Sequence, residues 1–200
     1  MSVNLSKGHK ISLKKEAGEQ LSNIIMGLGW DQKKKEKAKG WKGFFKSSGS
    51  SSGSIDLDAS CILLDENKQL VDSVWFQQLR SKDGSIQHTG DNLTGAGEGD
   101  DEQIKINLNN VPPQVKYLVF TINSYTSQSF AEVENAFCRI VNQRNNKEIA
   151  RYNLSGGGDY TAQIMAKLYR YEGEWKMHAI GEGTQGKTYK DMLPFIQSII

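Results

Sequence analysis

Residues 161–181 read TAQIMAKLYRYEGEWKMHAIG, and this stretch decides the fold class. Two runs, at about 161–171 and 174–181, alternate apolar residues with polar ones, and only Glu172-Gly173 separates them. Such alternation is typical of β-strands, and a short break that contains glycine is typical of a turn. The stretch therefore predicts two strands joined by a short turn.

The same pattern continues outward along the chain. Further strands are predicted at about 9–14, 22–30, 55–65, 70–77, 103–108, 115–123, 136–142 and 148–154. Many short strands at this spacing indicate a sandwich or a barrel, and not a parallel sheet with crossover helices. Short helical segments are predicted at 129–135 and at 188–200, and the second has an apolar face. We therefore expect one all-β domain over residues 1–200.

Composition limits the class of protein further. The chain has 200 residues, of which 37% are hydrophobic, and this length is enough to bury a core. Its first residues form no secretory signal, and no apolar run reaches the roughly 18–20 residues that cross a bilayer. Cys61 and Cys138 lie far apart in apolar runs, where cysteine usually behaves as a small buried hydrophobe. We expect a cytoplasmic protein with two unreactive thiols.

Charge is strongly segregated along the chain. Residues 31–50 contain seven lysines and two acids, a net charge of +5, whereas residues 54–102 carry a net charge of −8. The lysines run into a Ser/Gly-rich segment, which predicts a flexible loop at about 32–54. This loop is either solvated or, through its interleaved aromatic residues, a contact for a membrane surface or a partner. Nucleic-acid binding is not expected, because no recognised motif accompanies the charge.

The acidic stretch at 89–102 reads TGDNLTGAGEGDDE and is the most informative for function. Five carboxylates and one amide lie within its last twelve residues, interleaved with glycines. Crowded anions repel one another unless a cation offsets them, and oxygen ligands in irregular loops favour Ca²⁺ over Mg²⁺. The stretch lacks cysteine and histidine, which argues against zinc or copper. The alternative is an acidic face that is only solvated.

A second acidic group precedes this stretch. Asp56 and Asp58 are two residues apart, so in a strand they share one face, and Asp31 ends the preceding predicted strand. The EF-hand pattern matches nowhere in the chain. His88 is the one histidine near the acidic stretch, and we expect it to orient a loop and not to bind a metal.

Several motifs in this order resemble one known family. They are Gly27-Leu28-Gly29-Trp30-Asp31, Asp56-Leu57-Asp58-Ala59-Ser60, His88-Thr89-Gly90-Asp91-Asn92-Leu93-Thr94-Gly95, Gly99-Asp100-Asp101-Glu102, Asn135-Ala136-Phe137 with Arg139, Glu148-Ile149-Ala150-Arg151-Tyr152 and Gly173-Glu174-Trp175-Lys176. Together they closely resemble the TerD family of tellurium-resistance and bacterial stress proteins, and most closely its TerZ branch. The resemblance covers nearly the whole chain.

This resemblance implies a fold, a cofactor and a role. The fold is a β-sandwich of two mainly antiparallel sheets with short peripheral helices, including a C-terminal helix. The cofactor is Ca²⁺, expected as two ions, and the implied ligands are Asp31, Asp56, Asp58, Asp91, Asn92, Glu98, Asp100, Asp101 and Glu102, with backbone carbonyls near Gly97 and Gly99. Where many relatives carry acids, this chain has Ala96 and the longer Glu98.

The implied role is non-enzymatic. The family resemblance points to an interaction or sensor module in tellurite resistance, acting in the cytoplasm with other Ter-family proteins and with a membrane-associated Ter complex. Membrane contact is expected to be peripheral only. Two alternatives remain open at this stage: a metal-assisted hydrolase that recruits Asp56 and Asp58, and a membrane-surface adaptor that uses the 32–54 loop.

Overall fold

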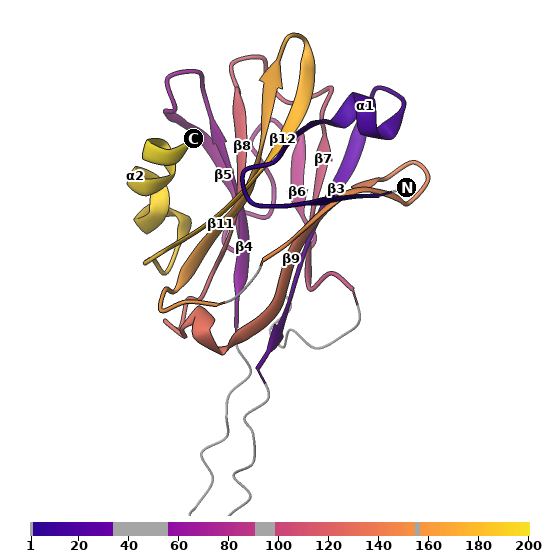
Figure 1. Ribbon diagram of the computed structural model, residues 1–200. Helices are drawn as coiled ribbons and strands as arrows, with labels where there is room; N and C mark the ends of the chain where they lie inside the picture. Colours follow the sequence, from indigo (N-terminus) through magenta and orange to yellow (C-terminus); the bar gives the residue numbers. More distant parts are fainter. Residues whose placement is uncertain (1, 34–55, 91–98, 155–156) are drawn as a thin grey trace, which may run out of the picture.

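Two six-stranded sheets pack face to face in the computed structural model, which describes residues 2–33, 56–90, 99–154 and 157–200 (Figure 1). Sheet A contains, in spatial order, β1 (Val3–Leu5), β10 (Lys147–Asn153), β9 (Val133–Asn142), β3 (Asn23–Gln32), β7 (Glu102–Asn107) and β6 (Ile86–His88). Sheet B contains β2 (Lys10–Ser12), β12 (Glu174–Thr184), β11 (Ala162–Tyr171), β8 (Tyr117–Asn123), β4 (Asp58–Leu64) and β5 (Leu70–Val74). The pair β1–β10 is parallel and the other described pairs are antiparallel, which confirms the predicted sandwich.

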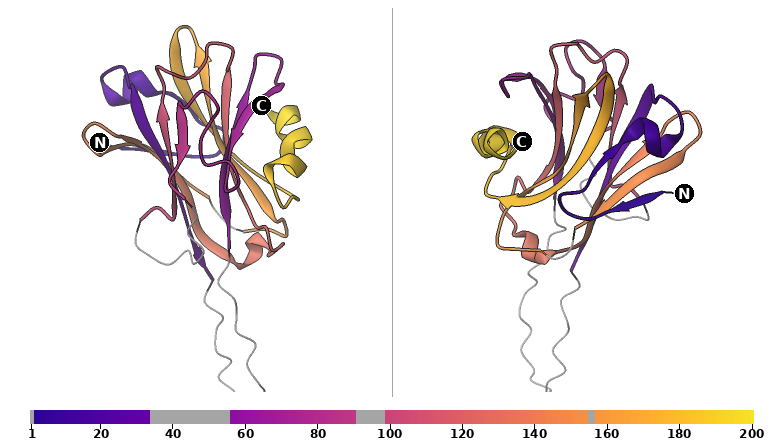
Figure 2. Two further views of the ribbon diagram at one scale, coloured as in Figure 1. Left: turned by 180° about the vertical axis from the view of Figure 1, so that it is seen from behind. Right: turned by 45° about the horizontal axis from the view of Figure 1, so that its top comes forward.

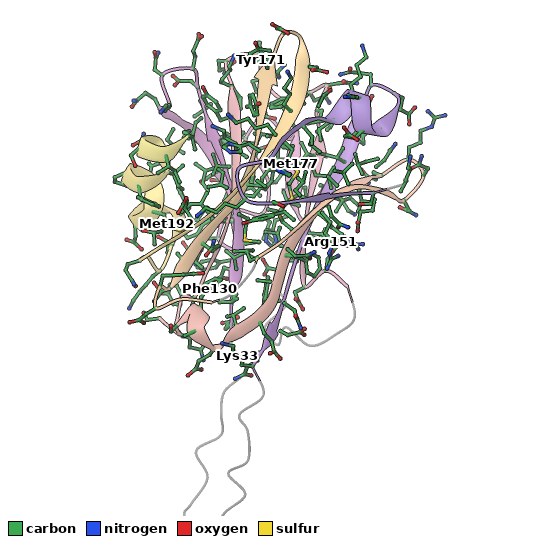
Figure 3. The ribbon with its side chains drawn as sticks, in the orientation of Figure 1. Lys33, Phe130, Arg151, Tyr171, Met177 and Met192 are labelled. Atoms are coloured by element: carbon green, nitrogen blue, oxygen red, sulfur yellow. The ribbon has the colours of Figure 1, made fainter. Side chains whose placement is uncertain are left out.

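The main core lies between the two sheets. In β3, Met26 and Leu28 are fully buried, and Met177 of β12, labelled in the middle of Figure 3, belongs to the same buried cluster from the side of sheet B. Burial of one such side chain stabilises the fold by about 1.5–3 kcal/mol. The alternation along β3 leaves Gly27 and Gly29 on the outer face of sheet A.

A second apolar cluster lies on the outer face of sheet B, beneath the C-terminal helix α2 (Tyr189–Ile199) (Figure 2). Met192 and Ile196 of α2 are fully buried against Ile62 and Val119 of the sheet. The helix begins at Thr188, whose backbone N–H donates to the carboxylate of Asp191 at 3.0 Å. The predicted C-terminal helix is confirmed. Within the described residues, no helix is long and apolar enough to cross a membrane.

One strand prediction is wrong in part. The strand predicted at 9–14 ends at Ser12, and a short helix, α1 (Leu13–Ala17), follows. The Ser12 hydroxyl accepts a hydrogen bond from the Lys15 N–H at 3.2 Å, and Gly18 ends the helix in a left-handed conformation. These two caps favour the helix over a continued strand.

Two short strands were not predicted, and the boundary between the predicted helix at 129–135 and the next strand was placed wrongly. β1 and β6 have three residues each, too few for an alternating pattern to stand out. The helix predicted at 129–135 is a single turn, η1 (Phe130–Glu132), and β9 begins at Val133. Pairing of β9 with β3 therefore extends further toward this turn than the sequence indicates.

Candidate functional site

Three consecutive acids, Asp100, Asp101 and Glu102, run alongside β3 at one end of the sandwich. The Asp101 N–H donates to the Leu28 carbonyl at 2.8 Å, and Glu102 pairs with Leu28 as β7 begins. The regular strand begins only at Glu102, so the three carboxylates do not follow strict alternation, and each points in a different direction. Each has its own set of contacts.

Asp100 points to the outer face of sheet A and is held by Arg139. The guanidinium donates from Nε to Oδ1 at 2.7 Å and from Nη2 to Oδ2 at 3.1 Å, a bidentate pair in which the Asp100 side chain is almost fully buried. Gln103 adds a third hydrogen bond at 3.1 Å. The carboxylate occupies the space where a Cβ on Gly27 would lie, so glycine is required at that position. Asp100 therefore anchors the acidic segment to the sheet.

Asp101 lies at the end of the sandwich. Its Oδ2 accepts a hydrogen bond from the Trp30 N–H at 2.7 Å. Burial raises the pKa of the Asp101 carboxyl, the negative charges of Asp31 and Asp100 raise it further, and the Trp30 hydrogen bond opposes them. The charged form of Asp101 is thus disfavoured first by burial and then by its anionic neighbours, and a bound cation would offset both effects.

Glu102 points into the interior and bridges the two sheets. Its Oε2 accepts from the Ala59 N–H of β4 at 2.6 Å and lies 3.1 Å from Nε2 of His88. Nδ1 of His88 accepts from the Gly90 N–H at 3.1 Å, so the neutral ring carries its proton on Nε2 and donates it to Glu102. The expected role of His88 in orienting a loop is confirmed by these two bonds.

Asp31 is the last residue but one of β3, and its charge acts on Asp101. Asp31 is exposed, and its Oδ2 accepts from the Asn135 side-chain amide at 2.8 Å. Asn135 adopts a left-handed backbone conformation, with φ of 55°, which asparagine tolerates better than most residues. The first acid of the predicted set is thereby fixed to the neighbouring strand β9.

Asp58 and Asp56 reach the same end from sheet B. Asp58 is buried where β4 begins, opposite Asn123 of β8. The backbone N–H of Asp56 donates to the Gln128 side-chain carbonyl at 3.2 Å. Figure 1 shows the end of β3 and the start of β4 together at the lower end of the sandwich.

The structure thus brings Asp31, Asp58, Asp101 and Glu102 to one end and directs Asp100 outward. The carbonyl of Gly99 lies against Gly29 of β3. Four predicted positions, Asp91, Asn92, Gly97 and Glu98, lie outside the described residues, as do residues 34–54 of the predicted loop. Among the described residues alone, no group of three or more His, Cys, Asp or Glu side chains forms a metal site.

Arg139 is the functional neighbour that sequence reasoning did not assign. It stands in the middle of an otherwise apolar run of β9 and also contacts Glu148 at 3.2 Å. A charged residue inside an apolar strand was the available signal, because such a charge requires a partner. The cysteines follow expectation: both are fully buried, and burial raises the pKa of Cys61 and raises that of Cys138 to about 12.

Comparison with known proteins shows the family. The model of the TerD domain matches residues 1–193. The chain belongs to the TerD family. It is 44% identical to the tellurium resistance protein TerZ of Serratia marcescens, over 99% of this chain and 98% of that protein. It is 42% identical to the stress response protein SCP2 of Bacillus subtilis (strain 168), over 96% and 98% of the two chains.

Solved structures of TerD-like proteins share the fold. A crystal structure of a homologue of the telluride resistance protein TerD from Streptomyces coelicolor A3(2) matches with a TM-score of 0.65 at 19% identity, covering 86% of this chain and 95% of that one. A protein of unknown function matches with a TM-score of 0.66. At this sequence identity, the structural similarity shows the β-sandwich fold and nothing about function.

Proposed function

We propose that this TerD-family chain is a calcium-binding, non-enzymatic stress-response protein that acts in tellurite resistance. The role is supported by the relatives, which are named for tellurium resistance and for stress response. The observation that supports the calcium proposal is that Asp31 and Asp101 of sheet A and Asp58 of sheet B lie at the same end of the sandwich, where burial, and then the charges of Asp31 and Asp100, raise the pKa of Asp101.

The residues present fit a hard divalent cation. All the predicted ligands are oxygen donors, and Ca²⁺ accepts six to eight oxygens in flexible geometry. Asp31 and Asp101 would hold the ion from sheet A and Asp58 from sheet B, with Asp91, Asn92 and Glu98 as further predicted ligands for two ions. Bound Ca²⁺ would neutralise the acids and link the two sheets. Asp100, held by Arg139, and Glu102, held by Ala59 and His88, would position the segment that carries Asp101.

The proposed setting is the cytoplasm, with other Ter-family proteins as partners, including a membrane-associated Ter complex. An end of the sandwich that is ordered and neutralised by calcium would present a surface to a partner that the calcium-free form lacks. Growth of a deletion strain on tellurite, complemented with wild type or Asp101→Asn, tests the cellular role. Equal tellurite resistance with the wild-type gene and with the Asp101→Asn gene would contradict a role of this site in resistance.

The calcium proposal is tested by thermal unfolding in Ca²⁺, in Mg²⁺ and in chelator. Saturating Ca²⁺ stabilises a folded protein that binds it by about 2.7 kcal/mol at a hundredfold excess over Kd, which corresponds to a rise in melting temperature of roughly 5–10 °C. We expect the highest melting temperature in Ca²⁺ and the lowest in chelator. Equal melting temperatures in Ca²⁺ and chelator would refute calcium binding.

A matched pair of variants locates the ion. Asp101→Asn keeps an oxygen for the Trp30 N–H but removes the charge, and it should abolish the calcium-dependent rise. Asp65→Asn is the control, because Asp65 also accepts a backbone N–H, that of Gln69 at 2.8 Å, in the turn between β4 and β5. Asp65→Asn should leave the rise intact. Loss of the rise in both variants would show that the effect is not local to the acidic end.

A further inference from the structure

A cavity of about 330 Å³ lies at the open edge of the sandwich, between β1 and β10 of sheet A and β11 and β12 of sheet B. None of the predicted calcium ligands lines it. Its walls include Ser6, Tyr152, Tyr160, Gln163 and Gly181, which is a largely polar set. The volume falls within the range of about 300–1,000 Å³ that is typical of small-molecule sites.

Gln163 forms the inner wall of this cavity. Its neighbours Ala162 and Ile164 belong to the outer cluster beneath α2, so the Gln163 side chain points between the sheets, where it is only 1% exposed. Its Oε1 has no hydrogen-bond partner among the described residues. A buried polar atom without a partner costs about 1–3 kcal/mol, and native proteins leave few of them. The amide is therefore placed to receive a donor from outside the chain.

Two tyrosines line the cavity, and two glycines of β12 make room for them. A Cβ on Gly181 would collide with the hydroxyl of Tyr152, and a Cβ on Gly183 would collide with the ring of Tyr160. Burial raises the pKa of both phenols, so both hydroxyls stay protonated and able to donate. Within the described residues, neither hydroxyl takes part in a hydrogen bond.

The charge at the mouth of the cavity is balanced. Lys7, which lines the entrance, pairs with Glu182 at 2.8 Å, so its ammonium already has a counter-ion. The remaining lining side chains are two amides, hydroxyls, aromatic rings and two leucines, which carry no charge. Such a lining matches a ligand that presents several hydroxyls and no net charge. Aromatic faces and a few placed polar groups are the usual elements of small-ligand recognition.

We propose that this cavity binds a small, neutral, polyhydroxylated molecule of monosaccharide or polyol size. Oε1 of Gln163 accepts a hydrogen bond from one ligand hydroxyl, the hydroxyls of Tyr152 and Tyr160 bond to others, and the ring of Tyr160 packs against the ligand's carbon skeleton. The site is separate from the acidic end and does not require calcium. It gives the chain a ligand-binding function in addition to the proposed one.

NMR titration of the ¹⁵N-labelled full chain tests the proposal. The probes are glucose, ribose, myo-inositol and glycerol, added in Ca²⁺ and again in chelator. We expect saturable shifts for the Gln163 side-chain amide and for the Gly181 and Gly183 backbone amides with at least one probe, equal in both conditions. Absence of saturable binding by all four probes would overturn the proposal, and leave calcium binding untouched. Tighter binding of glucuronate or glucose 6-phosphate than of glucose would also overturn it.

Two variants separate ligand binding from a structural role of the amide. Gln163→Leu replaces the buried amide with an apolar group of similar size, so its melting temperature should equal or exceed that of wild type. Its affinity for the bound probe should fall at least roughly tenfold, the loss of about one well-formed hydrogen bond. Gln87→Leu, the same change at an exposed position of β6, is the control and should bind normally.

Tyr160→Phe removes a single oxygen and should weaken binding without unfolding the protein. Wild-type affinity in Gln163→Leu would overturn the proposal. A third result would also overturn it: the wild type binds none of the probes and Gln163→Leu is markedly less stable. That result would mean that the Gln163 amide binds an ordered water and not a ligand.

Discussion

The outer faces of the two sheets are built from the same alternating pattern but hold different contents. The outer face of sheet A carries a charged network in which Arg139 joins Asp100 and Glu148, and Arg151 lies 3.6 Å from the centre of the Phe137 ring. The outer face of sheet B is apolar and lies beneath α2. Figures 1 and 2 show α2 covering sheet B alone.

The two outer faces therefore make different contributions: that of sheet B mainly stabilises the fold, and that of sheet A mainly positions side chains. A sheet face buried under a helix stabilises the fold through hydrophobic burial, which is large and does not require an exact geometry. A face that carries a bidentate ion pair contributes less net stability but fixes direction, because the guanidinium and carboxylate must align. On sheet A the pair fixes Asp100, and through it the segment that carries Asp101. We therefore expect variants of the two faces to divide stability and calcium response between them.

The largest stability loss is expected on the sheet B side. Met192→Ala removes a fully buried side chain between α2 and the sheet, and it should lower the free energy of unfolding by about 3 kcal/mol, measured by urea denaturation. The calcium-dependent rise in melting temperature should remain, because Met192 packs on the outer face of sheet B, away from Asp101 of sheet A. The control is Leu79→Ala, at a side chain that is 44% exposed, which should change stability by less than about 0.5 kcal/mol. Loss of the calcium response in Met192→Ala would contradict the idea that the two faces act independently.

A smaller stability loss with a larger effect on calcium is expected on sheet A. Arg139→Leu leaves the buried Asp100 carboxylate without its partner and should cost about 2 kcal/mol. Because the acidic segment then loses its anchor, the calcium-dependent rise should shrink as well. Thermal unfolding in Ca²⁺ and in chelator measures both effects.

Two further variants check this interpretation of Arg139. Arg144→Leu breaks the exposed pair with Glu19, which is 3.3 Å long, and should change little. Arg139→Leu combined with Asp100→Leu removes the isolated charge and should recover part of the stability but none of the calcium response. A full calcium response in Arg139→Leu would show that Asp101 is positioned without this anchor.

The contrast between the two faces also shows which features of the structure can be predicted from the sequence. The inward row of β3, Met26 and Leu28 among it, follows directly from period-two alternation, and so did the sandwich class. The apolar face of residues 188–200 likewise predicted a covering helix. These features depend on neighbours within a few residues, and a pattern in one sequence records such neighbours well.

The site was predicted less completely, for a physical reason. Residue types and spacing marked Asp31, Asp58 and Asp101, and the fold brings these three to one end. The partner of Asp100 could not be foreseen, because Arg139 is 39 residues away and the pair depends on the register of β9 against β3. The different directions of the three consecutive acids could not be foreseen either, because they depend on the backbone at the start of β7.

The smallest expected effect concerns the part of sheet B that α2 leaves uncovered. Lys167 is nearly buried there, with its ammonium 5.2 Å and 5.6 Å from the ring centres of Tyr117 and Tyr169. Burial, reinforced by the charges of Lys10 and Lys68, lowers the pKa of Lys167 to about 8. His178 lies opposite Lys167 on β12, and burial and the charges of Lys167 and Lys10 lower its pKa, so it adds no charge in the alkaline range.

The sign of the pH effect follows from this lowered pKa. Between about pH 8 and 10.5 the folded protein holds Lys167 neutral while the unfolded chain still binds the proton, so raising the pH in this window favours the folded state. The gain should be no more than about 1 kcal/mol, because solvent screens a charge at the face of the sheet. Lys167→Met should lack this gain when urea midpoints are compared at both ends of the window, whereas Lys14→Met, at an exposed position of α1, should keep it. An equal gain in Lys167→Met and wild type would mean that water solvates the Lys167 ammonium well and that another group causes the gain.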